Sequence, residues 1–265
     1  MIIRKTPAEL DKIAAAGKVL VRCHEVLRRK ARPGVSTAEL DQAAERFIRS
    51  QGAEPAFKGY RGFPGSICAS PNSMVVHGIP GSYKLGRGDL LSLDIGVVLD
   101  GWVADAAITH PIGNVTPVAS RLLTSTRAAL FDAVEQCWPG KRLGDVSHAV
   151  QQRVEADGFG VIRSLVGHGI GRDMHEDPQI PNYGEPGTGP ELEEGMVLAI
   201  EPMVNVGDHE VRIGSDNWAV YSRDGSLAAH FEHTVAVTAE GPRILTPWHE
   251  LLDLAAPAPP SAASA

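Results

Sequence analysis

The chain has 265 residues, of which 43% are hydrophobic and 22% are charged, and its formal net charge is -7. Such a chain can bury one sizeable core, as one large domain or as two fused halves, and its acidic balance argues against broad nucleic-acid binding, so no DNA partner is expected. No apolar run is long enough to span a bilayer, no segment resembles a secretory signal, and the cysteines Cys23, Cys68 and Cys137 predict a reducing cytoplasm rather than a disulfide framework.

Two helices are predicted at the amino-terminal end of the chain. Residues 6–9 have the spacing of a capping box with proline at the first helical position, and this helix is expected to run to about Arg32. Residues 36–39 predict a second helix start, and Gly52 predicts its end. The apolar face of this second helix is formed by Leu40, Ala43, Ala44, Phe47 and Ile48.

Residues 90–108 contain two aliphatic runs separated by Asp-Gly, which is typical of a β-hairpin with a two-residue turn. In that register Gly96 faces Asp105, and Asp94 and Asp105 share one face as diagonal neighbours. Diagonal positions lie roughly 7 to 8 Å apart, which lets two carboxylates converge on a pair of metal ions. Gly96 is expected to leave room for the ions. A loop one residue longer would put the aspartates on opposite faces.

The second helix has a counterpart later in the chain. At a constant offset of 106 residues, Pro33, Gly34, Glu39, Leu40, Ala43, Ile48 and Gly52 correspond to Pro139, Gly140, Asp145, Val146, Ala149, Val154 and Gly158. The constant offset indicates an internal duplication, although any two amphipathic helices that follow Pro-Gly would share much of this pattern. Acidic residues in the strand-like runs of both halves favour the duplication, with a metal site at the seam.

The second half supplies the other candidate metal ligands. His168 lies between two glycines and His175 follows seven residues later, Glu201 ends an apolar strand-like run, and Glu232 lies in another. A lone histidine is more often structural, and a lone strand glutamate is often solvated. An acidic residue inside an apolar run is nevertheless poorly placed unless it is paired or metal-bound. Together with the aspartates, these residues predict a hydrolytic site for a pair of divalent ions.

At this point the motifs resemble those of one known family, the type I methionine aminopeptidases of the short bacterial form, within the M24 metallopeptidases. The similarity runs from about Thr6 to Pro247. It implies an α+β pita-bread fold, in which a pseudo-two-fold curved antiparallel sheet is backed by helices. One catalytic domain is expected over residues 1–254, and an Ala/Pro/Ser-rich composition predicts a disordered tail over residues 255–265. The motifs are His77-Gly78-Ile79-Pro80, Asp94, Asp105, Gly167-His168-Gly169-Ile170-Gly171, Glu201-Pro202-Met203 and Glu232-His233-Thr234.

The resemblance implies a metal centre with five ligands. Asp94 would bind one ion, and His168 and Glu201 would bind the other. Asp105 and Glu232 would bridge the two ions, and a water between them would attack the scissile carbonyl. Iron, manganese, cobalt and zinc all suit this ligand set.

The resemblance also implies catalytic and substrate-binding residues. Glu201 would act as the general base, and His175 would hydrogen-bond the substrate near the scissile amide. His77 would lie near the leaving-group nitrogen or the substrate backbone, as a donor or proton shuttle. The methionine pocket would be lined by Tyr60, Phe63, Cys68 and Trp218, for which ordinary core packing is the alternative. The chain departs from the usual family pattern at Phe57, His110 and Met174, which leaves the pocket shape open.

The implied function is removal of the initiator methionine from nascent proteins whose second residue is small. A cytoplasmic monomer near the ribosome is expected. Two other functions stay open. One is an Xaa-Pro aminopeptidase or dipeptidase of the same fold, and the other is a non-catalytic pita-bread protein that only binds a partner.

Overall fold

The computed structural model of the protein describes residues 1–251. The expected domain over residues 1–254 extends three residues past this limit, and the expected disordered tail over residues 255–265 lies outside the described residues. Within residues 1–251, none of the helices combines the length and apolar character needed to cross a membrane.

The helices begin and end close to the positions that the sequence predicts. Thr6 caps the first helix and forms the predicted capping box with Glu9. This helix ends at Lys30, two residues before the predicted end, because Arg32 precedes a proline and is therefore disfavoured in the helical region. The helices of the described chain are α1 (Pro7–Lys30), α2 (Thr37–Ser50), η1 (Tyr60–Gly62), α3 (Pro117–Val134), α4 (Leu143–Ala156) and α5 (Trp248–Leu251).

All strand pairings among residues 1–251 are antiparallel. In the first half β4 pairs with β1, β2 and β5, and in the second half a sheet has the order β15-β14-β9-β7-β8. Two smaller sheets have the orders β13-β10-β6 and β11-β12-β3. The strands are β1 (Glu54–Pro55), β2 (Cys68–Pro71), β3 (Met74–Val76), β4 (Leu90–Leu99), β5 (Trp102–Pro111), β6 (Gly160–Val161), β7 (Val166–Gly169), β8 (Glu176–Pro181), β9 (Val197–Ile200), β10 (Met203–Asn205), β11 (Val211–Ile213), β12 (Val220–Ser222), β13 (Ala228–His230), β14 (His233–Thr238) and β15 (Gly241–Ile244).

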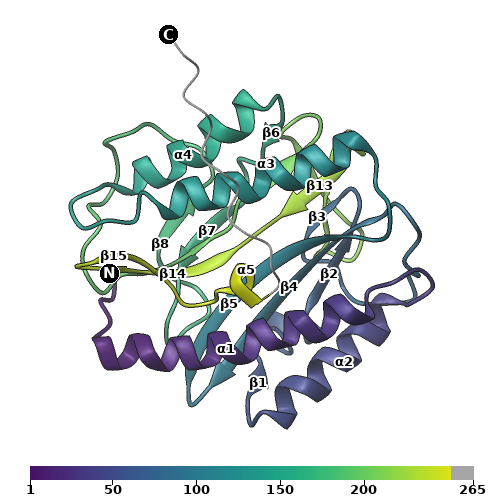
Figure 1. Ribbon diagram of the computed structural model, residues 1–265, viewed down its shortest axis with the longest axis horizontal. Helices are drawn as coiled ribbons and strands as arrows, with labels where there is room; N and C mark the ends of the chain where they lie inside the picture. The colour runs from purple at the N-terminus through teal and green to yellow at the C-terminus, as the bar shows by residue number, and fades with distance from the viewer. Residues whose placement is uncertain (252–265) are drawn as a thin grey trace.

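The two halves of the chain repeat one arrangement, as the duplication predicts. Helices α2 and α4 begin 106 residues apart and end 106 residues apart, and the same offset relates β1 to β6. β1 pairs with β4 just as β6 pairs with β10. In the view of Figure 1, α1 and α2 cover the lower part of the strands and α3 and α4 cover the upper part. This pseudo-two-fold α+β arrangement is the one expected.

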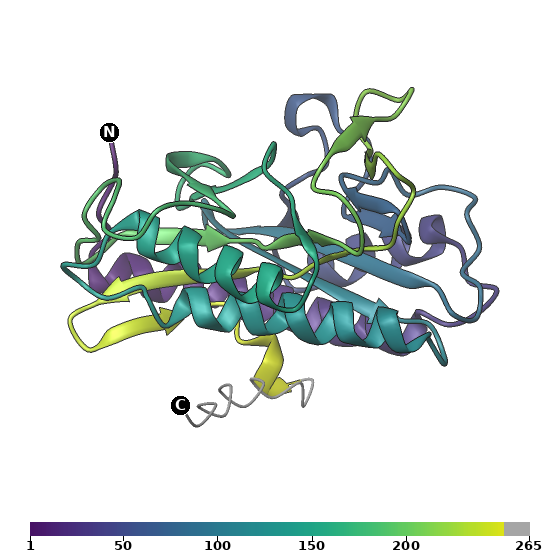
Figure 2. The same ribbon diagram turned by 90° about the horizontal axis from the view of Figure 1, so that it is seen from above.

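Helices α1 and α3 lie on the side of the strands opposite to the β11–β12 hairpin. Helix α1 packs on β4 and β5, and it buries Ile13, Leu20 and Leu27 completely. Burying each such side chain contributes about 1.5 to 3 kcal/mol to the free energy of folding. Figure 2 shows the green segment that contains β11 and β12 projecting from the side opposite to α3. The helix side therefore holds the core, and the other side is free to form a pocket.

Candidate active site

The β4–β5 hairpin places Asp94 and Asp105 on one face. The observed register pairs Gly96 with Asp105, as predicted, and the longer loop is excluded. The two turn residues, Asp100 and Gly101, have positive φ angles of 51° and 74°, as in the type I′ turns whose twist matches that of paired strands. The diagonal arrangement of the two aspartates is thus confirmed.

Three buried side chains converge at this face. One ligand atom from each of Asp105, His168 and Glu232 lies within 4.8 Å of the other two. His168 Nε2 is 4.0 Å from Asp105 Oδ2 and 3.7 Å from Glu201 Oε1. The other ring nitrogen, Nδ1, is 2.9 Å from the Gly169 carbonyl oxygen and can donate its proton there, which leaves Nε2 as the atom able to bind a metal ion.

The carboxylates of the cluster lack counter-charges. Burial raises the pKa of Asp94 to about 7 and that of Glu201 to about 7. Burial and then repulsion between neighbouring carboxylates raise the pKa values of Asp105 and Glu232 well above the ordinary range. One oxygen each of Asp94, Asp105 and Glu232 is buried without a hydrogen-bond partner. Unpartnered carboxylate oxygens beside a free imidazole nitrogen are a donor set that fits divalent metal ions.

Backbone contacts hold Asp105 and Glu232 in place. The Thr234 hydroxyl donates to the Asp105 carbonyl at 2.7 Å and accepts the Asp105 N–H at 3.1 Å. The Glu232 N–H donates to the Ala107 carbonyl at 2.9 Å, and the buried Trp248 indole donates to the Glu232 carbonyl at 2.8 Å. These bonds join β5 to the connection between β13 and β14, which carries Glu232, and so hold the two carboxylates close together.

His175 lies beside the cluster and contacts two rings. Its Nδ1 is 2.8 Å from the Tyr60 hydroxyl, and its ring lies 4.2 Å from the His168 ring. Burial, and then the neighbouring His168, lowers the pKa of His175 to about 4, so the ring is neutral near pH 7. When Tyr60 donates to Nδ1, the neutral ring carries its proton on Nε2 and can donate it.

The loop that carries His175 is anchored by the next residue. The Glu176 carboxylate accepts the Arg172 N–H at 2.8 Å and the Lys5 ammonium at 2.5 Å. The side chains of Lys5 and Glu176 are only 2% and 5% exposed. A buried charge pair of this kind fixes the loop against the amino-terminal segment, because removing either partner leaves the other charge uncompensated.

His77 reaches the same cavity from a strained turn. Its φ angle is 60°, a value that costs a residue other than glycine on the order of 1 to 3 kcal/mol. Gly78 follows because a Cβ there would lie 2.3 Å from the Ala69 carbonyl oxygen. The Gly78 N–H donates to the Ser70 hydroxyl at 3.0 Å. The strain is compatible with a functional position, since the surrounding contacts determine it.

One cavity of about 150 Å³ brings the sequence-predicted residues together. Phe63 and Trp218 meet edge to face there with ring centres 5.1 Å apart. The pKa of the Cys68 thiol is raised well above its ordinary value by burial and by nearby carboxylates, so this cysteine forms a wall rather than a nucleophile. All eleven predicted site residues line the cavity: Tyr60, Phe63, Cys68, His77, Asp94, Asp105, His168, His175, Glu201, Trp218 and Glu232.

The expected role of Gly96 is wrong. A Cβ at Gly96 would lie 2.7 Å from Phe57 Cε1 and 2.8 Å from Met174 Cε. The absent side chain therefore makes room for these two side chains and not for metal ions. Phe57 lines the cavity, whereas Met174 is buried behind it and is 5% exposed.

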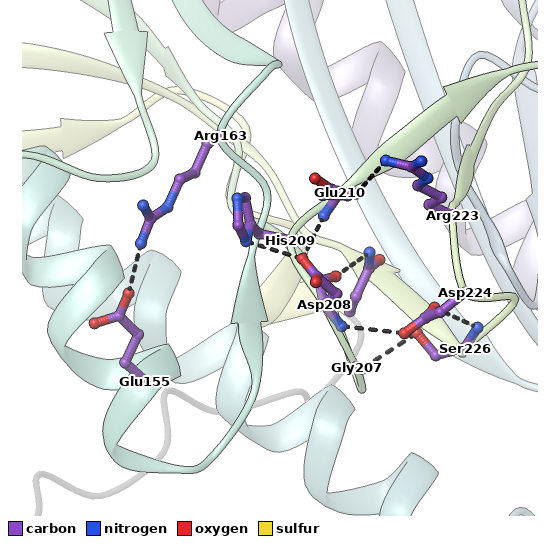
Figure 3. A network of polar contacts seen from close by, with 10 residues as sticks. Glu155, Arg163, Gly207, Asp208, His209, Glu210, Arg223, Asp224 and Ser226 are labelled. Atoms are coloured by element: carbon purple, nitrogen blue, oxygen red, sulfur yellow. Dashed lines mark hydrogen bonds and ion pairs between the residues drawn. The ribbon is translucent and has the colours of Figure 1, made fainter.

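Trp218 belongs to the turn between β11 and β12, and a polar network fixes the base of this hairpin (Figure 3). The Asp224 carboxylate accepts the Asp208 N–H at 3.1 Å and the Ser226 N–H at 2.9 Å. The Gly207 N–H donates to the Ser226 hydroxyl at 3.2 Å. A Cβ at Gly207 would lie 2.0 Å from Asp224 Oδ2, so a larger residue there would displace the Asp224 carboxylate from these bonds.

His230 lies beside the cluster although no sequence motif predicted it. This residue is 1% exposed, its Nε2 lies 3.4 Å from Glu201 Oε2, and neither ring nitrogen has a hydrogen-bond partner. The available signal was its position two residues before Glu232 in a strand-like run. His110, one of the departures from the family pattern, lines a second cavity on the helix side and not this one.

Comparisons with known proteins identify the family. The chain matches metallopeptidase family M24 over residues 11–239. It is 53% identical over 246 residues to methionine aminopeptidase 1 of Bacillus subtilis, covering 93% of this chain and 99% of that protein. The crystal structure of methionine aminopeptidase from Thermotoga maritima matches with a TM-score of 0.91 and 45% identity, over 93% of this chain and 99% of that chain.

A more distant match shows the fold alone. The prolidase of Pyrococcus furiosus aligns with a TM-score of 0.76 and 24% identity, over 92% of this chain and 65% of that chain. The pita-bread fold expected from the motifs is therefore confirmed. About half of the residues are identical over nearly the full length of the Bacillus subtilis protein, which is a far closer relation than a shared fold. The chain belongs to metallopeptidase family M24 and, within it, to the methionine aminopeptidases.

Proposed function

We propose that this protein removes the amino-terminal methionine from nascent polypeptides whose second residue is small. The observation that carries the proposal is the single cavity in which an Asp, His and Glu cluster meets aromatic side chains. One chain supplies every expected ligand, so a monomer suffices. The substrate and the three unpaired cysteines fit action in the cytoplasm, close to the ribosome.

Two divalent ions, of iron, manganese, cobalt or zinc, fit the residues present, because the cluster offers buried oxygens that lack partners. Asp94 would hold one ion, and His168 and Glu201 would hold the other. Asp105 and Glu232 would bind both ions, and the mutual distance of at most 4.8 Å between their ligand atoms and that of His168 supports this role. When bound, the ions supply Lewis-acid polarisation of the scissile carbonyl and lower the pKa of water.

The side chains around the cluster have distinct roles in the proposal. Glu201, whose carboxylate lies beside His168 at the cluster, takes the proton of the attacking water and passes it to the leaving amine. His175 donates from Nε2 to the oxygen on which negative charge develops, and Tyr60 holds its ring in that orientation. His77 lies near the leaving nitrogen.

The apolar end of the cavity would receive the methionine side chain. Phe63 and Trp218 present a ring edge and a ring face, with which a thioether sulfur makes favourable contacts. Tyr60 and Cys68 complete the walls, and Phe57 narrows the space. The size of this pocket limits which side chain the first residue of the substrate can have.

Release of free methionine from Met-Ala-Ser and Met-Lys-Ser tripeptides tests the proposal. Metal-stripped protein is assayed with and without Mn(II), Co(II) or Fe(II), and metal-dependent cleavage of the Ala peptide alone is expected. Cleavage of Xaa-Pro peptides instead would support the dipeptidase alternative. A folded protein that gains neither activity nor melting temperature from any of these ions would support a non-catalytic binding role.

A further inference from the structure

A second cavity, of about 320 Å³, lies on the helix side of the strands. Arg28 of α1, Ser120, Thr124 and Arg127 of α3, and His110 of β5 contribute to its lining. Figure 1 shows the strands around β5 between α1 and α3. No lining residue is common to this cavity and the active-site cavity, so the two cavities are distinct.

The lining carries positive charge without a counter-charge. It includes two arginines and no aspartate or glutamate. The acidic residues nearest to them on the same helices are engaged elsewhere, since Glu25 pairs with Arg29 and Asp132 pairs with Arg153. Within residues 1–251, neither Arg28 nor Arg127 forms an ion pair, and an anion in the cavity would therefore meet uncompensated guanidinium groups.

Two buried nitrogens at the cavity have no partner. Arg127 is half-buried, its Nε has no hydrogen-bond partner, and burial lowers its pKa. His110 is 5% exposed, and its Nε2 also has no partner. Buried donors without an acceptor are costly, and a guanidinium presents them in the planar geometry that oxyanions accept.

His110 is suited to a neutral donor role. Burial, and then His24 and Arg28, lowers the pKa of His110 to about 3, so its ring is uncharged near neutral pH. A neutral imidazole still offers one N–H. The two arginines thus supply charge, and the histidine supplies a buried hydrogen bond at the sheet.

We propose that this cavity binds a phosphate-type oxyanion between Arg28 and Arg127, with His110 at its inner end. A volume of 320 Å³ exceeds the share of roughly ten water molecules, so it accommodates a phosphate group with a small organic substituent. The ligand class is inorganic phosphate or the terminal phosphate of a small monoester. A phosphate inside a nucleic-acid strand carries chain on both sides and fits this concave site less well.

The test measures phosphate binding by the full-length, metal-loaded protein. Inorganic phosphate is titrated calorimetrically into the wild type and into a variant with Arg28→Met and Arg127→Met. Arg22→Met is the matched control, because Arg22 lies on α1, is exposed and does not line the cavity. We expect the wild type and the control to bind alike, and the double variant to bind at least about tenfold more weakly, the loss typical of a removed charged hydrogen bond.

Stability without phosphate separates this proposal from a folding defect. In phosphate-free buffer, Arg127→Met is expected to melt at or above the wild-type temperature, since it removes an unpartnered buried nitrogen. The rise in melting temperature that phosphate causes in the wild type is expected to be mostly lost in this variant. Methionine release without phosphate is expected to be unchanged. An equal phosphate response in the double variant, or an equal loss in Arg22→Met, would overturn the proposal, the first outcome indicating binding at the metal centre.

Two further ligands distinguish the sources of the phosphate. Glycerol 3-phosphate is expected to bind in the arginine-dependent manner of inorganic phosphate, and a single-stranded oligonucleotide without a terminal phosphate is expected not to bind. Arginine-dependent binding of the oligonucleotide alone would contradict a small-molecule site and indicate a nucleic-acid contact.

Discussion

At the scale of single residues, Glu201 is placed both to bind a metal ion and to transfer a proton. Its Oε1 is 3.7 Å from His168 Nε2, close enough for the two side chains to share a metal ion, and its Oε2 is 3.4 Å from His230 Nε2. Its position just after β9 is the reason, because the strand end carries the side chain into a buried site, and this burial raises its pKa to about 7 in the absence of metal. A strand glutamate elsewhere would be solvated.

We predict that Glu201→Gln lowers kcat by at least about 100-fold, the effect of losing a positioned acid or base. The fold should persist, because the amide fills the same space without the desolvation of a charge. Steady-state kinetics and the melting temperature of the metal-free protein measure the two effects. A near-normal kcat in a metal-loaded variant would remove Glu201 from the mechanism.

His230 is predicted to hold Glu201 in place. Its Nε2 lies near Glu201 Oε2, on the side away from His168 Nε2, which is near Oε1. His230→Leu should weaken metal binding or kcat by about 10- to 100-fold, as is typical for partners of metal ligands. His230→Gln should retain more of both because it keeps a donor. Calorimetric metal titration measures the metal affinity of both variants, and steady-state kinetics measures their kcat. Equal metal affinity and equal kcat in the two variants would show that His230 has a packing role only.

At the scale of elements, the predictions that succeeded depended on local rules. The capping box at Thr6 and the Asp-Gly turn each act within a few residues, so the start of α1 and the β4–β5 register could be predicted. Gly96 was misjudged because its contacts, Phe57 and Met174, come from segments that only the tertiary fold brings together. The five metal ligands could be predicted from acidic residues and a histidine in apolar or glycine-rich contexts, whereas the roles of His77 and of the pocket residues came from a family resemblance. His230 was missed because neither signal pointed to it.

The hairpin that carries Trp218 is predicted to set substrate affinity. Gly207→Ala would place a methyl group against Asp224 Oδ2 and break the network at the hairpin base. We expect KM for Met-Ala-Ser to rise several-fold with little change in kcat, because the metal cluster is untouched. Arg163→Met is the control, since its exposed pair with Glu155 in Figure 3 contributes about 0 to 1 kcal/mol. A kcat loss without a KM change would contradict this assignment.

At the scale of the whole molecule, the pseudo-two-fold arrangement explains where the charges meet. Asp94 in the first half and Glu201 in the second lie 107 residues apart, nearly the repeat offset, and both face the same cavity. The seam therefore collects carboxylates from both halves, although each half alone follows ordinary strand rules. Without metal, ionisation of these buried carboxylates lowers the free energy of unfolding.

The stability of the metal-free protein is therefore predicted to fall as pH rises. Unfolded carboxylates titrate near pH 4, whereas those of Asp94 and Glu201 titrate near 7 in the folded chain and those of Asp105 and Glu232 well above their ordinary values. Between about pH 4 and 7, the unfolded chain loses protons that the folded chain keeps. The contribution of these four carboxyl groups to the free energy of unfolding is therefore largest below pH 4 and decreases as pH rises.

Metal ions should reverse this dependence, because they bind the ionised carboxylates. Melting temperatures at pH 5.5, 6.5 and 7.5, with and without Mn(II), measure both effects. We expect the rise caused by Mn(II) to be larger at pH 7.5 than at pH 5.5 by about 2 to 4 °C or more, the shift that roughly 1 kcal/mol gives in a domain of this size. Asp105→Asn should flatten the metal-free profile, since it removes one buried carboxylate. If the metal-free profile rises with pH and Asp105→Asn leaves it unchanged, the carboxylates are not the buried, charge-deficient cluster that the structure describes.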